Sequence, residues 1–150
     1  MYRMRVLPRD YLIIALFAIL GVFAVFAHAP LEITATSADG RVTLFGQAPK
    51  SFGTFRIMKA DAAPEEPYTE ILGPIYAVTP NTRLLPIPIT VSISYTDVDL
   101  HGHPPRDLVL GYWDVASARW QEAPSIVRED VQTVYAQTRT LSLWALMVQP

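Results

Sequence analysis

The chain has 150 residues, with 12 basic and 14 acidic side chains and a formal net charge of −2. It contains no cysteine, which excludes a disulfide framework, a thiolate metal site, a cysteine nucleophile and attachment through a lipoprotein cysteine. Beyond the N-terminus the basic residues are scattered along the sequence. We therefore expect no nucleic-acid partner, because binding the phosphate backbone needs a clustered basic surface.

The first thirty residues have the pattern of a membrane-targeting segment. An uncharged apolar run begins at Tyr11 and ends at Ala27, and three arginines precede it. This run is near the lower length limit for spanning a bilayer core of about 30 Å, so we expect the membrane to be its partner. The arginines predict a cytoplasmic N-terminus, which places everything after Pro30 on the far side of the membrane.

The fate of this segment stays open among three alternatives. It is either a retained anchor or a signal peptide that is removed by cleavage, for example after Ala27, because both have a basic start and an apolar stretch. A buried core helix is the third alternative. We predict two parts of the chain: residues 1–30, a cytoplasmic basic tip with a membrane anchor or signal, and residues 31–150, an extracytoplasmic domain that is anchored or secreted.

The remainder of the sequence predicts short strands joined by turns. Thirteen prolines and seven glycines accompany many Val, Ile, Thr and Tyr residues. An alternating pattern predicts a half-buried strand over residues 85–95. One face has Ile87, Ile89, Val91, Ile93 and Tyr95, and the other has Pro88, Thr90, Ser92 and Ser94. The other expected strands are residues 31–36, 41–45, 54–59, 75–79, 107–113 (with a hairpin turn leading to Trp120), 131–138 and 141–148.

Seven to nine strands at this spacing predict an all-β fold. We expect an antiparallel two-sheet sandwich, preceded by one N-terminal hydrophobic helix that is either transmembrane or a signal. An acidic, proline-bearing loop is expected over residues 61–67.

Three segments in order resemble one known family. They are GPIYAVTPNTRLLPIPITVSISYTD, DLVLGYWDVASARWQEAPSIV and VQTVYAQTRTLSLWALM. Together they are similar to the ZU-five-type β-sandwich module of ankyrins, netrin receptors and bacterial surface proteins, best over residues 73–148. Some members of that family cut themselves at a His-Phe-Ser sequence, to which Thr140, Leu141 and Ser142 correspond here. Threonine cannot serve as the base, so we expect no cleavage between Leu141 and Ser142.

Two groups of residues are candidates for ligand binding. Asp97, Asp99, His101 and His103 alternate, and an extended segment would project all four to one side as a site for zinc or another divalent ion. The alternative is a polar loop that is simply solvated. A second group of aromatic residues is either a stacking platform for glycan or part of the core. Its members are Tyr112, Trp113, Trp120, Tyr135 and Trp144.

The sequence indicates no enzyme. It has no G-x-S-x-G elbow, phosphate-binding glycine loop or H-E-x-x-H helix, and we expect neither a cofactor nor a small-molecule substrate. The prediction is a structural or interaction module of the cell envelope or surface, with a protein partner there. The alternatives are a ligand-binding domain for glycan or a divalent metal, and an accessory subunit of a membrane assembly.

Overall fold

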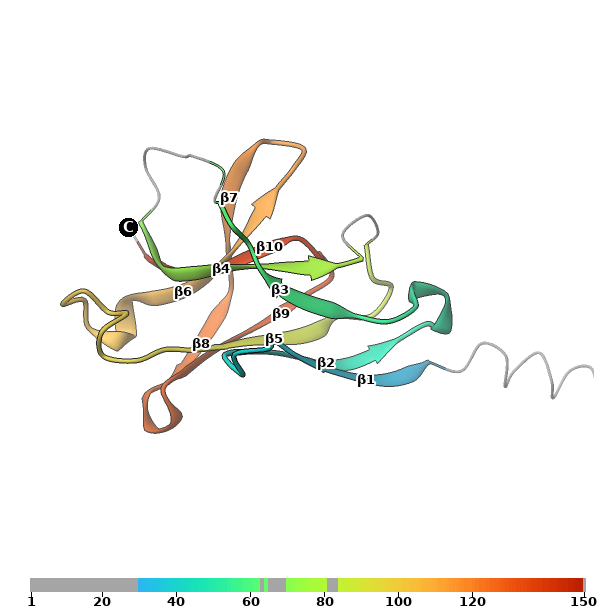
Figure 1. Ribbon diagram of the computed structural model, residues 1–150, viewed down its shortest axis with the longest axis horizontal. Helices are drawn as coiled ribbons and strands as arrows, with labels where there is room; N and C mark the ends of the chain where they lie inside the picture. The colour runs from blue at the N-terminus through green and yellow to red at the C-terminus, as the bar shows by residue number, and fades with distance from the viewer. Residues whose placement is uncertain (1–29, 63, 65–69, 81–83, 150) are drawn as a thin grey trace, which may run out of the picture. The chain divides into compact units, whose positions relative to one another are not determined.

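The computed structural model describes residues 30–62, 64, 70–80 and 84–149, which contain ten β-strands in two antiparallel sheets. Sheet A has the order β1-β2-β5-β9-β8, and sheet B has the order β3-β4-β10-β6-β7. Figure 1 shows the two sheets as separate layers. The predicted all-β, antiparallel two-sheet sandwich is confirmed. The predicted membrane segment lies outside the described residues. Within the described residues, no helix is both long enough and apolar enough to span a bilayer.

The strands of each sheet have the following bounds. Sheet A consists of β1 (Leu31–Thr36), β2 (Val42–Ala48), β5 (Ile89–Ser94), β9 (Thr133–Thr138) and β8 (Ser125–Arg128). Sheet B consists of β3 (Arg56–Lys59), β4 (Ile71–Thr79), β10 (Leu143–Val148), β6 (Leu108–Asp114) and β7 (Arg119–Ala123). Three single-turn 3₁₀ helices interrupt the connections: η1 (Lys50–Phe52), η2 (Pro105–Asp107) and η3 (Glu129–Val131).

The core lies between the sheets and follows from the alternation of side chains along each strand. In β5, Ile89, Val91 and Ile93 are buried in the main hydrophobic cluster, as the period of two predicts. Trp144 and Leu146 of β10 enter the same cluster from sheet B. Burying each such side chain contributes on the order of 2 kcal/mol, which allows a domain without disulfides to be stable.

Sheet B also carries a second apolar cluster on the face that points away from the main core. Ile75, Val109, Trp120, Ala145 and Met147 form it, and all five are buried. Gly111 belongs to this face because a Cβ atom there would meet the Met147 sulfur. Sheet B therefore already covers part of its outer face with its own side chains.

Several predicted boundaries differ from the observed ones. The strand predicted over residues 85–95 begins only at Ile89, and Ile87 is 41% exposed. Pro86 and Pro88 explain this difference, because proline cannot donate a hydrogen bond to a strand ladder. The strand predicted at residues 75–79 starts earlier, at Ile71, and β8 was not predicted at all.

Candidate functional site

The loop that follows β5 is held by an ion pair from the start of β2. Arg41 donates from Nη1 to Asp99 Oδ1 at 3.3 Å, and its Nε donates to the Ser94 carbonyl at 3.2 Å. Asp99 Oδ2 also accepts from the Thr96 backbone N–H and hydroxyl, each at 2.7 Å. The Asp99 side chain is 13% exposed. This aspartate is therefore used to fix the loop.

Gly73 of β4 allows this arrangement. Its φ of +72° is a conformation that other residues rarely adopt. A Cβ atom added there would come within 3.2 Å of Asp99 Oδ1. Glycine at this position therefore lets the sheet B strand approach the Arg41–Asp99 pair.

A second aspartate joins the two sheets at the β1–β2 turn. Asp39 Oδ2 accepts from the Tyr76 hydroxyl of β4 at 2.7 Å, and Asp39 Oδ1 accepts from Ser37 Oγ at 2.6 Å and from the Arg41 backbone N–H at 3.1 Å. Burial and the hydrogen bond with Asp39 raise the pKa of Tyr76. Tyr76 therefore stays protonated and acts as a donor to the Asp39 carboxylate.

The same contacts set the charge of both aspartates. Burial raises the pKa of Asp99, but the hydrogen bonds from Thr96 and the hydrogen bond and charge of Arg41 outweigh it, so the net shift is downward. The pKa of Asp39 is lowered in the same way, by hydrogen bonds from Ser37, Tyr76 and the Arg41 backbone that outweigh burial. Asp39 and Asp99 are therefore both ionised near neutral pH. The same hydrogen bonds that keep them ionised hold their loops in place.

The remaining members of the predicted metal group point to different partners. Asp97 Oδ1 accepts from Gln132 Nε2 at 3.0 Å, and His103 Nε2 lies 3.1 Å from Glu70 Oε1. His101 is exposed, with a φ of +49°. Across the described ranges, no group of three or more His, Asp or Glu side chains is placed to hold a metal ion. The structure does not bring Asp97, Asp99, His101 and His103 together, and metal binding by this loop stays a prediction from the sequence.

The aromatic group does not form one exposed platform. Trp144 is 0% exposed, and Trp120 is buried with an edge-on contact to Trp113. Tyr112 packs against Trp144 with 5.5 Å between ring centroids. Tyr135 is half-buried on sheet A, away from the other four on sheet B. Four of the five aromatics therefore serve packing around sheet B.

Ser142 uses its hydroxyl within the fold. Its Oγ donates to the Trp113 carbonyl at 2.5 Å, and its own carbonyl accepts from the Val78 N–H at 2.9 Å. Both Leu141 and Ser142 are buried. Ser142, which directly precedes β10, thus links this part of the chain to β6 and β4.

Sheet A presents an outer face with few charges, which we call the threonine-rich face. Its residues are the strand positions that alternate with the buried core positions. They are Glu32, Thr34, Thr36, Thr43, Phe45, Gln47, Thr90, Ser92, Ser94, Ile126, Arg128, Thr133, Tyr135 and Gln137. Only Glu32 and Arg128, which lie on the two edge strands, are charged.

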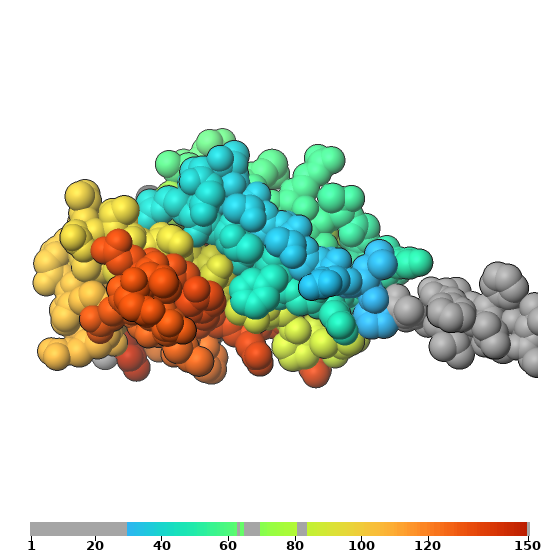
Figure 2. All heavy atoms as spheres, turned by 90° about the horizontal axis from the view of Figure 1, so that it is seen from below, coloured from blue at the N-terminus to red at the C-terminus, as the bar shows by residue number. Residues whose placement is uncertain are grey.

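The threonine-rich face also carries large apolar side chains. Phe45 is 41% exposed and pairs with Thr90 across β2 and β5, while Ile126 is 68% exposed and lies opposite Tyr135. Figure 2 views the molecule from the side of sheet A, where early (blue and cyan) and late (orange-red) parts of the chain lie on one surface. Five strands from distant parts of the sequence therefore build this face.

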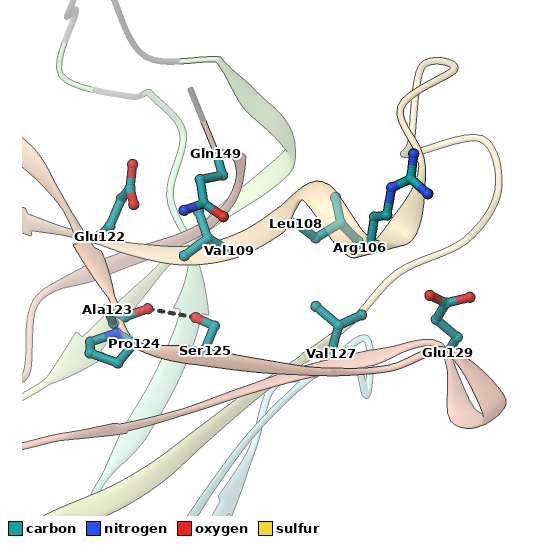
Figure 3. A pocket seen from close by; sticks show the side chains of 10 residues that line it. All are labelled: Arg106, Leu108, Val109, Glu122, Ala123, Pro124, Ser125, Val127, Glu129 and Gln149. Atoms are coloured by element: carbon teal, nitrogen blue, oxygen red, sulfur yellow. Dashed lines mark hydrogen bonds between the residues drawn. The ribbon is translucent and has the colours of Figure 1, made fainter.

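Two hollows lie beside the edge strand β8. One is a groove between β6 and β8, with a cavity volume of about 530 Å³. Figure 3 shows Val127 and Glu129 on one side of this groove and Leu108 and Arg106 on the other. The second hollow lies on the threonine-rich face, where Thr90, Ile126, Tyr135 and Gln137 are among its lining residues.

The sequence pattern predicted neither the threonine-rich face nor the hollows beside β8. The threonine-rich face is distributed over five strands, and no motif links Phe45 to Tyr135. An alternating strand pattern does show which residues share a face, but the order of strands in a sheet is needed to assemble them. No family model matches the chain, and no curated protein matches it.

Proposed function

We propose that this chain is a non-enzymatic interaction module that binds a protein partner through the threonine-rich face of sheet A. The β-sandwich stands outside the membrane, in the cell envelope or at the surface. Residues 11–27 hold it there as an anchor, or it is released after signal cleavage. The resemblance to ZU-five-type modules stays part of this proposal and rests on the sequence alone.

The observation that carries the proposal is the near absence of charge on a face that also exposes Phe45 and Ile126. The cores of protein–protein interfaces are depleted of charged residues and enriched in aromatic ones. Covering this face requires little desolvation of charge, and the hydroxyls of its exposed Thr34 and Thr36 adapt as donors or acceptors. A protein surface of mixed apolar and hydroxyl character is the partner that such a face suits.

A membrane tether supports the same function. A module confined to the membrane surface meets other envelope proteins at a raised effective concentration, so a weak contact is sufficient. The ion pair of Asp99 with Arg41 and the hydrogen bond from Tyr76 to Asp39 fix the loops at one end of the sheets and keep the face in one conformation.

Photocrosslinking in living cells tests the proposal. A photoreactive amino acid replaces Gln137 or Thr34, which are exposed on the threonine-rich face, and in a control it replaces Ala116 in the exposed β6–β7 turn. We expect both face positions to give the same protein adduct and Ala116 to give none. Face positions that give no adduct in cells where the chain is folded would contradict the proposal.

A further inference from the structure

Strand β8 is an edge of sheet A with a hollow on each of its two sides. Ser125 and Val127 line the groove that separates β8 from β6. Ile126, whose side chain points the other way, lines the hollow on the threonine-rich face. An edge strand offers its free backbone N–H and C=O groups to an added strand, whose alternate side chains then point to opposite sides. The two hollows are placed to receive those two sets of side chains.

The groove is closed at one end and open at the other. At the closed end Ser125 Oγ accepts from the Leu110 N–H at 2.9 Å and donates to the Ala123 carbonyl at 2.6 Å, which ties β8 to sheet B. Strand β7 pairs with β6 only from Leu110 onward, so it does not extend alongside Leu108 and Val109. Figure 3 shows the groove opening from Ser125 toward Arg106 and Glu129.

The charges around the groove favour a basic ligand. Glu122 and Glu129 line it, and Arg106 is the one basic residue among the described residues that do so. The Arg106 guanidinium lies 3.7 Å from the Asp107 carboxylate, which offsets its charge. The walls between these groups are the apolar side chains of Leu108 and Val127. Lysine and arginine match this combination, because their aliphatic stems lie on apolar surface while their heads reach acidic groups.

We propose that β8 binds an extended segment of a partner protein as an additional strand of sheet A, and that this segment has the pattern basic–apolar–basic. The inference rests on the proposed interaction function and names the chemistry of the partner. The basic side chains enter the groove beside Val127, and the apolar side chain packs on Ile126. Main-chain hydrogen bonds to β8 supply affinity, and the two hollows supply specificity.

Labelled synthetic peptides test the inference on the full chain in detergent micelles, with fluorescence anisotropy as the readout. The basic peptide is Thr-Lys-Val-Lys-Val-Thr, and its acidic twin has glutamate in place of each lysine. A third peptide keeps the basic sequence but carries N-methyl groups on alternate backbone nitrogens, which blocks pairing on one edge. A fourth carries them on the other nitrogens, so that both edges are examined. We expect the unmodified basic peptide to bind, the acidic twin to fail, and at least one methylated peptide to fail.

Paired charge reversals locate the binding site. The Glu122→Lys/Glu129→Lys variant reverses both groove carboxylates, and we expect it to weaken binding of the basic peptide about tenfold. The control variant Asp61→Lys/Glu70→Lys makes the same change in net charge at exposed positions outside the groove and outside the threonine-rich face, and we expect it to bind nearly as the parent chain does. All replaced residues are exposed, so both variants are expected to fold, which thermal unfolding checks.

Each result decides for or against the inference. Binding by the methylated peptides as tight as that of the parent peptide would exclude strand addition, and equal weakening by both double variants would exclude the groove. No binding by the basic peptide would also overturn the inference. Adducts at Gln137 and Thr34 would show in that case that the interaction function stands, and that only the strand addition at β8 is wrong.

Discussion

Arg41 and Asp99 are 58 residues apart in the sequence, and together they connect the start of β2 to the loop after β5. Their side chains are 26% and 13% exposed. The loop for which the sequence predicted metal binding is thus held by a guanidinium from the residue just before β2. Three consequences for stability and ligand binding follow from this pair and its neighbours.

Removing the arginine should destabilise the domain. Arg41→Met leaves the partly buried Asp99 carboxylate with fewer donors and removes the hydrogen bonds to the Ser94 carbonyl, so we expect a loss of about 1–3 kcal/mol in the free energy of unfolding. Arg106→Met, whose side chain is 80% exposed, is the matched control, with an expected loss under about 0.5 kcal/mol. Urea denaturation measures both, and equal losses would contradict the role of the Arg41–Asp99 pair.

Acid should destabilise the domain. Asp39 and Asp99 have a lower pKa in the folded chain than the value of about 3.9 expected when it is unfolded. Their stabilisation is complete above that unfolded value and is lost as the pH falls through the folded values, because the unfolded chain takes up protons first. We expect the melting temperature to fall between roughly pH 5 and pH 3. A melting temperature that stays constant or rises over this range would contradict the account.

The double variant Asp39→Asn/Asp99→Asn checks which residues cause that pH dependence. It should begin with lower stability and lose less of it on acidification. The half-buried Asp114 and the exposed Asp130 also have lowered pKa values, so part of the pH dependence is expected to remain. A slope unchanged from that of the parent chain would assign the effect to other groups.

Zinc should leave the domain unaffected. Asp99 is paired with Arg41, Asp97 accepts from Gln132, and His103 lies beside Glu70, so a metal ion would have to break these contacts to collect its ligands. We expect the melting temperature to be the same with and without added zinc. A rise that grows with zinc concentration and disappears in His101→Ala/His103→Ala would restore the metal site.

Gly111 and Met147 should be coupled. A Cβ atom at Gly111 would overlap the sulfur of Met147, which is buried. We expect Gly111→Ala to cost about 1–3 kcal/mol through overpacking. Met147→Ala removes the obstructing atoms, so the double variant should cost less than the sum of the two single variants. Additive losses in urea denaturation would show that these two side chains do not compete for space.

The sequence predicted the parts of this fold that depend on local periodicity. Ile89, Val91 and Ile93 enter the core as expected, because alternation requires only neighbouring residues. Ile87 continues the same pattern but is exposed, because Pro86 and Pro88 keep that part of the chain out of the ladder. Strand β8 has only four residues and follows Pro124, which leaves too short a pattern to recognise.

The candidate sites could not be predicted, because they depend on contacts between distant segments. Nothing near Asp99 in the sequence shows that Arg41 will occupy its carboxylate. Likewise, Phe45 and Ile126 share a face only because β5 and β9 lie between their strands. Spacing along one loop suggested convergent ligands, whereas the side chains of this loop contact Arg41, Gln132 and Glu70, which lie in three other parts of the chain.

Labelling of introduced cysteines tests the central claim most directly, since the chain has no cysteine of its own. Single variants Gln137→Cys and Thr34→Cys report on the threonine-rich face, and Ala116→Cys reports on the exposed β6–β7 turn. Intact cells and purified chain are treated with a membrane-impermeant maleimide. We predict that Ala116→Cys reacts at the same rate in both, whereas the two face variants react more slowly in cells because a partner covers them. Protection of all three in intact cells, or equal rates at the face in cells and in purified chain, would contradict a module that binds a partner outside the membrane.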